Sequence, residues 1–265
     1  MYDYYLGGSH NFAVDRQAAE QVVKVIPNVR QIAVANRAFL RAAVLYLLDL
    51  GVRQFLDVGS GIPTVGNVHE VAQAVDPHAR VVYVDLDPVA VTHAQRLLSG
   101  NDRATAIAAD LRHPDAILAH RSLRETLDLT QPVGLLLVSV LHFLPDSDAY
   151  PAVARLREAL SPGSGLVISH AAAEGLARDS SDAAATVYQR STAPGGAVRT
   201  RAEIERFFDG YDLLAPGLVW VSQWQPAGIA EVGAHPEHIA LLAGVASKPG
   251  TDTVTLACRA STRPG

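Results

Sequence analysis

The sequence predicts an α/β protein with a mostly parallel sheet, because short apolar runs alternate with helical patterns between residues 54 and 170. In the helical stretches, apolar residues recur at spacings of three and four, which is the pattern of amphipathic helices. These helices are expected at residues 68–75, 89–98, 115–127 and 149–160. The strands are expected at residues 54–58, 81–85, 104–108, 133–139 and 165–169. Strands that are apolar along their whole length indicate a parallel sheet covered by helices on both faces.

The segments on either side of this core complete the predicted architecture. Two helices, at residues 13–26 and 30–50, precede the sheet and are expected to form an N-terminal helical cap or lid over residues 1–52. A helix at 201–208 and two late strands at 218–224 and 239–246 follow, and the late strands are expected to pair as an antiparallel hairpin. The prediction is therefore a Rossmann-like, doubly wound sheet of seven strands over residues 53–249, with a tail at 250–265.

Composition points to a small-molecule ligand. The formal net charge is −5, whereas a general nucleic-acid binder usually presents a basic face. The scattered arginines 199, 201 and 206 are interpreted as a solvated helix surface. The single cysteine, Cys258, excludes an internal disulfide. Residues 1–12 lack the pattern of a signal peptide, and the apolar stretch 135–144 is too short to cross a bilayer, so a cytoplasmic protein without a membrane partner is expected.

The stretch "QFLDVGSGIPTVGNVHE" at residues 54–70 joins the first strand to a helix through two close glycines. Gly59 and Gly61 allow positive φ and a close approach of the backbone to a ligand. The dinucleotide fingerprint requires a third glycine where this chain has Thr64, and no Gly-Lys-Ser/Thr of a phosphate-binding loop follows. The glycine pair alone leaves the ligand class open.

Acidic residues after three successive strands narrow the choice. Asp57 precedes the glycines, where a carboxylate repels a pyrophosphate but suits an ammonium or sulfonium group. Asp85 ends the second strand, where a carboxylate can accept both hydroxyl hydrogens of a ribose. Asp110 follows the third strand, with a turn or helix-start role as the alternative. Asp87, before Pro88, is expected to cap a helix.

Successive stretches resemble the motifs of a class I S-adenosylmethionine-dependent methyltransferase: "FLDVGSGIPT", "VVYVDLDP", "AADLRHP", "PVGLLLVSVLHFLPD" and "LSPGSGLVISH". More closely, "YDYYLGGSHNFAVDR", "NRAFLRAAVLYL" and "GNVHEVAQ" resemble an actinobacterial family of S-adenosyl methyltransferases formerly listed as a domain of unknown function. The likeness covers about residues 1–249, and "GGSH" replaces the commoner Gly-Gly-Lys-Asp. Family members usually have further residues ahead of this stretch, so the chain is expected to begin late.

The resemblance implies S-adenosyl-L-methionine as cofactor and assigns roles to residues that match its motifs. Asp57, Gly59, Ser60 and Gly61 would hold the methionine portion of the cofactor. Asp85 would bind the ribose and Leu86 would lie against the adenine. Asp110 would accept from the adenine amino group, the backbone amide of Leu111 would reach a ring nitrogen, and the carbonyl of Ser139 would face the sulfonium. The implied activity is methyl transfer to a small-molecule acceptor.

The acceptor side is less defined by sequence. His142, after the fourth strand, is the candidate general base because histidine titrates near neutrality, with packing beside the cofactor as the alternative. His170 is a second, weaker candidate. No metal site is expected, because His235 and His238 are better explained by a surface loop.

Several roles stay open at this point. The aromatic strip around Tyr4 and Tyr5 is expected to act as a lid or a packed arm. Arg16 and Arg37 could pair with the cofactor carboxylate or simply lie on the surface. The rival functions are a cofactor-binding sensor without catalysis and an NAD-dependent oxidoreductase.

Overall fold

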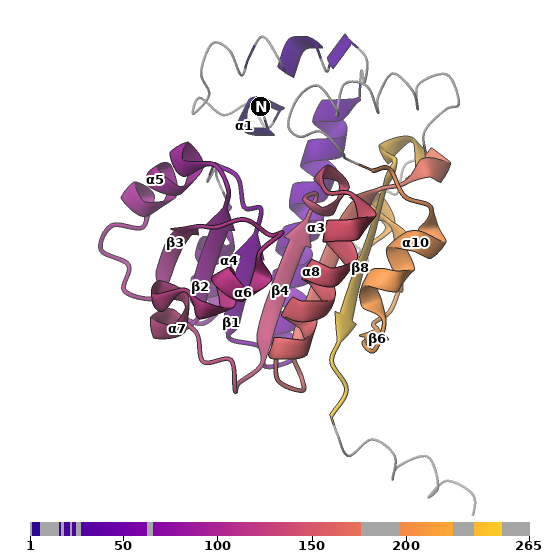
Figure 1. Cartoon of the computed structure of the whole chain (residues 1–265). Helices are drawn as coiled ribbons and strands as arrows, with labels where there is room; N and C mark the ends of the chain where they lie inside the picture. Colours follow the sequence, from indigo (N-terminus) through magenta and orange to yellow (C-terminus); the bar gives the residue numbers. More distant parts are fainter. Residues whose placement is uncertain are drawn as a thin grey trace, which may run out of the picture.

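The computed structural model describes residues 2–5, 16, 19–21, 23–24, 28–62, 66–175, 197–224 and 236–250. The expectations that fall partly or wholly outside these residues include the helix at 13–26, Thr64, the loop at 225–237, His235, Cys258 and the tail at 250–265. Within the described residues, one central sheet is flanked by helices on both faces (Figure 1).

The sheet has eight strands, and five of them are the parallel strands that the apolar runs predict. Their bounds are β1 Gln54–Val58, β2 Arg80–Asp85, β3 Ala104–Ala108, β4 Val133–Val138 and β5 Gly165–Ala171. The later strands are β6 Asp212–Leu213, β7 Val219–Trp220 and β8 Leu241–Ser247. The order is β3-β2-β1-β4-β5-β8-β6, and β7 also pairs with β8. β8 runs antiparallel to β5, β6 and β7, so the sheet is mixed at its C-terminal end.

The described helices of four residues or more are α1 Tyr2–Tyr5, α3 Val29–Asp49, α4 Val68–Val75, α5 Pro88–Leu97, α6 Pro114–Ala119, α7 Arg121–Thr126, α8 Asp146–Ala159 and α10 Arg201–Glu205. Short 3₁₀ turns lie at η1 Leu141–Phe143, η2 Ala173–Gly175, η3 Arg206–Phe208, η4 Val221–Gln223 and η5 Pro236–Ile239. In α5, Asp87 accepts a hydrogen bond from the amide of Val89 at 2.8 Å, which confirms the predicted cap before Pro88.

Two apolar cores lie on the two faces of the sheet, because successive strand residues point to opposite sides. In β4, Leu135 and Leu137 join the core that includes Leu156 of α8, whereas Leu136 joins the core that includes Leu47 of α3. The helical coverage of both faces that the sequence predicts is confirmed.

Helix α3 is the long helix that covers one face of the sheet (Figure 1). It is the one helix among the described residues that is long and apolar enough to cross a membrane by length and composition. A core helix passes the same test, and α3 packs against the sheet with a set of buried residues that includes Phe39, Ala43 and Leu47. Its length and apolar character are therefore accounted for by the core.

Three sequence expectations need correction in detail. The strand expected at 218–224 is reduced to β7 and the turn η4, because Trp224 turns into the core and packs edge-on against Phe39 at 5.2 Å between ring centroids. The helix expected at 115–127 is divided into α6 and α7 at His120, whose φ and ψ are extended. The helix expected at 201–208 is α10 followed by η3.

Candidate functional site

The candidate site lies at the carboxyl edge of the parallel strands, where a doubly wound sheet usually binds its ligand. Asp57 of β1 is in register with Tyr83 of β2, so the ends of the two strands lie side by side. The loop after β1 is tied to β2, because the amides of Gly59 and Ser60 both donate to the carbonyl of Val84, at 2.8 and 3.2 Å. The glycine turn and Asp85 are thereby brought to the same place.

Asp57 is buried at this edge, and its side chain is left without partners from the described chain. The residue is 6% exposed, and none of the described residues donates a hydrogen bond to its carboxylate. Burial raises the pKa of Asp57 from 3.8 to about 7, while the charge of Arg37 opposes this rise and that of Asp85 adds to it. A buried carboxylate with unmet acceptor capacity is costly, and a cationic ligand would relieve that cost.

Asp85 is half-buried and holds the glycine turn in place. Its two carboxylate oxygens accept from the amide of Gly61 at 2.7 Å and from that of Asp87 at 2.9 Å. An ionised carboxylate has about four acceptor positions, so capacity for ribose hydroxyls is left. The neighbouring Leu86 is 63% exposed, which gives an apolar surface beside the carboxylate.

The two glycines of the turn are required for different reasons. Both have positive φ, +78° at Gly59 and +66° at Gly61. A Cβ on Gly59 would clash with Cγ2 of Val140, so this glycine is required by contact with the loop after β4. A Cβ on Gly61 would meet no described atom within 4 Å, so none of the described residues fills the space beside this glycine. Gly61 is therefore the glycine whose surroundings suit a ligand.

Asp110 follows β3 at the same edge, but Arg112 already binds its carboxylate. The Nε and Nη2 atoms of Arg112 donate to Asp110 Oδ2 at 2.9 and 2.5 Å, and hydrogen bonds from Arg112 hold the pKa of Asp110 below its usual value. Leu111 is buried in the core, whereas none of the described residues accepts from its backbone amide. The backbone after Asp110 thus offers a donor, but the side chain would have to share its oxygens with Arg112.

Ser139, at the end of β4, is held in an unusual conformation by a buried polar group. Its φ is +55°, which a residue with a side chain rarely adopts. Asn36 of α3 donates to Ser139 Oγ at 3.0 Å and accepts from Ser169 Oγ at 2.6 Å, and the amide of Ser139 donates to Ser169 Oγ at 3.0 Å. Strained backbone that is fixed by its surroundings clusters at functional sites. The role of Asn36 was not apparent from the sequence.

His142 lies in η1 and is buried. Burial, with the charge of Arg199 as a second cause, lowers the pKa of His142 to about 4. Its ring packs edge-on against that of His170 at 5.6 Å. The imidazole is thus neutral at pH 7, but such a low pKa makes it a weak proton acceptor.

The second histidine candidate belongs to a cluster around a buried arginine, which we call the Arg199 cluster: Arg199, His170 and Asp146, whose side chain is 58% exposed. Arg199 is 1% exposed and donates to Asp146 Oδ1 at 2.7 Å and to His170 Nε2 at 2.7 Å. His170 Nδ1 lies 2.8 Å from the carbonyl of Ala171, so the ring donates there and accepts from the guanidinium. Both ring nitrogens of His170 are engaged, which leaves no free position for a reacting proton.

The interpretation of Arg199 as a solvated surface residue is wrong. It also donates to the carbonyls of Leu141 and Leu144, both at 3.0 Å, and its guanidinium lies over the ring of Phe207 at 5.2 Å. The arginine therefore fastens the loop after β4 from a position 55 or more residues further along the chain. The sequence carries no local signal for so distant a contact, whereas Arg206, in the same segment, is exposed as predicted.

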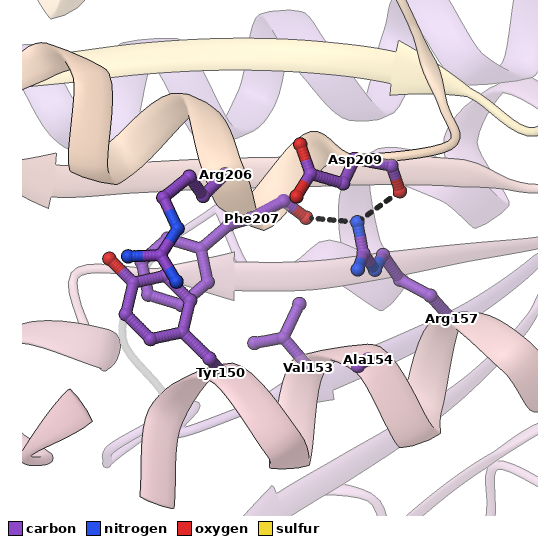
Figure 2. A pocket seen from close by; sticks show the side chains of 7 residues that line it. All are labelled: Tyr150, Val153, Ala154, Arg157, Arg206, Phe207 and Asp209. Carbon is purple, nitrogen blue, oxygen red and sulfur yellow. Dashed lines mark hydrogen bonds between the residues drawn. The ribbon is translucent and has the colours of Figure 1, made fainter. Parts of the chain in front are cut away.

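The candidate site is distinct from the hollows elsewhere on the molecule. Figure 2 shows one of them, between α8 and η3, where the Arg206 guanidinium lies over the ring of Tyr150 at 4.2 Å and Arg157 donates to the carbonyls of Phe207 and Asp209. Another hollow lies near the amino ends of β1 and β2 and is lined by residues 54, 80 and 124–129. Neither hollow contains a residue that the sequence assigns to the ligand. Among the described residues, no group of three acidic, histidine or cysteine side chains is arranged to hold a metal ion.

The chain is similar in sequence and in fold to known proteins. A family model described as S-adenosyl methyltransferase matches residues 1–249. A protein from Thermobifida fusca YX, assigned as a methyltransferase, is 38% identical, with a TM-score of 0.87 over 94% of this chain and 93% of that one. A DUF574 family protein from Streptomyces avermitilis is 39% identical, with a TM-score of 0.86 over 94% of this chain and 95% of that one. Among curated protein sequences, none matches the chain.

The family match spans nearly the whole chain, and the two solved structures share its fold over almost their full length. The cofactor that the family description carries suits a site with a buried carboxylate, a second carboxylate and an exposed leucine at one edge. The chain belongs to the S-adenosyl methyltransferase family, and it is an S-adenosylmethionine-dependent methyltransferase.

Proposed function

We propose that this chain transfers the methyl group of S-adenosylmethionine to a small-molecule acceptor in the cytoplasm. The observation that carries the site assignment is Asp57, a buried carboxylate that no described residue supplies with a hydrogen bond. Residues 1–52 would then cap the cofactor-binding domain at 53–249. When bound, the cofactor would supply a methyl group carried by a positively charged sulfur. This methyl group is transferred to the acceptor by direct displacement.

In this proposal the residues of the carboxyl edge bind and orient the cofactor. Asp57 binds the ammonium group, and Asp85 accepts the ribose hydroxyls with the positions that Gly61 and Asp87 leave over. The apolar side chain of Leu86 lies against the adenine. A ring nitrogen of the adenine accepts a hydrogen bond from the backbone amide of Leu111. The rate comes mainly from holding the reacting atoms in line.

On the acceptor side, the proposal gives Ser139 and His142 different tasks. The positive φ that Asn36 and Ser169 impose on Ser139 would direct its carbonyl toward the sulfonium. His142 stays the candidate general base. With a pKa of about 4, His142 would be unprotonated over the whole neutral range and so available as a base. The driving force for proton transfer to it would be small. This favours acceptors that lose a proton easily.

Calorimetric titration with S-adenosylmethionine, S-adenosylhomocysteine and NAD tests the cofactor site. We expect the two adenosyl compounds to bind and NAD not to bind. Asp85→Asn should abolish the binding, whereas Asp87→Asn, two residues away, keeps an N-cap side chain and should bind normally. Undiminished affinity in Asp85→Asn would refute the ribose assignment.

Methyl transfer itself is tested with methyl-labelled cofactor and fractionated small metabolites. We expect label to appear in one low-molecular-mass fraction with the wild-type chain and not with Asp85→Asn. His142→Asn should lower the rate without changing cofactor affinity if His142 acts as the base. Label found only in protein or nucleic acid would contradict a small-molecule acceptor.

A further inference from the structure

We infer that Arg37 binds the carboxylate at the amino-acid end of the cofactor, opposite Asp57, so that the site recognises a zwitterion with two opposite charges. This inference rests on the proposed function and deepens it, because it assigns a residue of the N-terminal cap to cofactor recognition. Neither the glycine turn nor the ends of the strands supply this cation, since Arg37 belongs to α3.

The position of Arg37 follows from how α3 is held. The preceding residue, Asn36, is 2% exposed and is fixed by hydrogen bonds to Ser139 and Ser169 at the ends of β4 and β5. This contact sets the rotation of the helix, and the next side chain along it, Arg37, is half-buried. Arg37 Nη2 lies 3.4 Å from Oδ1 of Asn67, the residue that precedes α4. The guanidinium therefore lies near the first turn of α4, which follows the glycine turn.

The charges around this point favour a bound carboxylate at Arg37. The charge of Arg37 acts on Asp57 across the site and lowers its pKa against the effect of burial. The amides of Gly66 and Asn67 are already taken by Glu70 Oε2, at 2.8 and 2.9 Å, so these donors at the start of α4 are occupied. An arginine side chain carries five donors in a planar fork that matches a carboxylate. Arg37, beside Asn67, and Asp57, at the end of β1, thus carry opposite charges that act on one another.

The alternative is that Arg37 only supports the fold at a partly exposed surface, as a simple interpretation of the sequence suggests. The two roles differ in what they predict for ligands. A binding role requires that removal of the arginine matters only when the ligand carries a carboxylate. A supporting role predicts the same loss for every ligand of the site.

The experiment is a cycle of two proteins and two ligands, measured by competition calorimetry. The ligands are S-adenosylhomocysteine and its decarboxylated analogue, which keeps the adenosine and the ammonium but lacks the carboxylate. The proteins are the wild-type chain and Arg37→Gln. Arg41→Gln is the matched control, because Arg41 lies one turn further along α3 and is exposed. A thermal denaturation curve for each protein confirms that it is folded.

We expect Arg37→Gln to lower the affinity for S-adenosylhomocysteine by about 10- to 100-fold, the usual range for a hydrogen bond to a charged group. The same variant should bind the decarboxylated analogue as the wild type does, and Arg41→Gln should change neither ligand. Equal losses for both ligands, or no loss for either, would overturn the inference while the cofactor site stands. If the wild-type chain bound neither ligand, the proposed function would fail, and the inference with it.

Discussion

Two polar regions meet at the carboxyl edge of this sheet, and they differ in how completely their groups are paired. In the Arg199 cluster, Arg199 and His170 are buried and fully paired: Arg199 has four acceptors around it, and both nitrogens of His170 are engaged. At the other region, Asp57 is nearly as buried but receives no hydrogen bond from the described chain. A closed network stabilises the fold, whereas unmet capacity in a buried group indicates where a ligand belongs. Substitutions in the two regions should therefore have opposite effects on stability.

The largest effect is expected for Arg199→Ala. The variant leaves His170 and two buried carbonyls without their shared donor, and each buried polar group left unpaired costs about 1–3 kcal/mol. Urea denaturation measures this as a lower free energy of unfolding. Arg155→Ala, on α8, the helix that begins at Asp146, is the control, because its exposed pair with Asp115 should contribute less than about 1 kcal/mol. Equal losses in the two variants would contradict the contrast.

Asp57→Asn should instead stabilise the protein without cofactor, in a pH-dependent way. The pKa of Asp57 is raised from 3.8 to about 7, so the folded state holds its proton more tightly than the unfolded state. The resulting penalty is absent below pH 4, grows as the pH rises and is complete above pH 7, where it reaches about 4 kcal/mol. Denaturation curves at pH 4 and pH 8 should therefore agree between variant and wild type at the lower pH and differ at the higher one. A variant less stable at pH 8 would count against this account.

Gly59→Ala separates the two glycines of the turn. The added Cβ would clash with Val140 at a residue whose φ is positive. Left-handed strain together with overpacking should lower the free energy of unfolding by at least about 2 kcal/mol. Gly61→Ala meets no described atom, so its cost in stability should be limited to about 1 kcal/mol of backbone strain while the affinity for S-adenosylhomocysteine falls. Gly59→Ala should therefore lose more stability, and Gly61→Ala should lose more affinity for S-adenosylhomocysteine.

Cofactor affinity should fall as the pH drops below about 7. An ammonium binds the ionised form of Asp57, and protonation competes with it, so the dissociation constant rises by at most about tenfold for each pH unit. Calorimetry between pH 6 and pH 8 measures this trend. The Asp57→Asn variant, which has no carboxyl group to titrate, should show a flat profile over the same range.

The smallest effect is expected for Arg112→Ala. The pair with Asp110 is half-exposed, so its removal should change the free energy of unfolding by less than about 1 kcal/mol. If Asp110 accepts a hydrogen bond from the adenine amino group, the variant should raise the affinity for S-adenosylhomocysteine by about threefold, because a donor that competes for the Asp110 carboxylate is removed. Weaker binding in the variant would show that Arg112 itself contributes to the site.

The sequence alone determined the parallel core of the sheet and the order of residues at its edge. The bounds of β1 and β3 follow from their apolar runs, and the Asp87 cap follows from the proline after it. These features depend on side chains that are close in sequence, so their spacing is sufficient to predict them. Asp57, Asp85 and Asp110 come together because parallel strands that share a sheet end at the same edge.

The tertiary structure decided the features that join distant segments. β8 enters between β5 and β6, Arg199 reaches back to the loop after β4, and Asn36 fixes Ser139 from 103 residues away. No local pattern distinguishes Arg199 from its exposed neighbour Arg206, since burial depends on which elements pack around a side chain. The ends of the strands could be predicted because each forms its own local pattern, whereas the contacts that tie α3 and the Arg199 cluster to them exist only once the chain has folded.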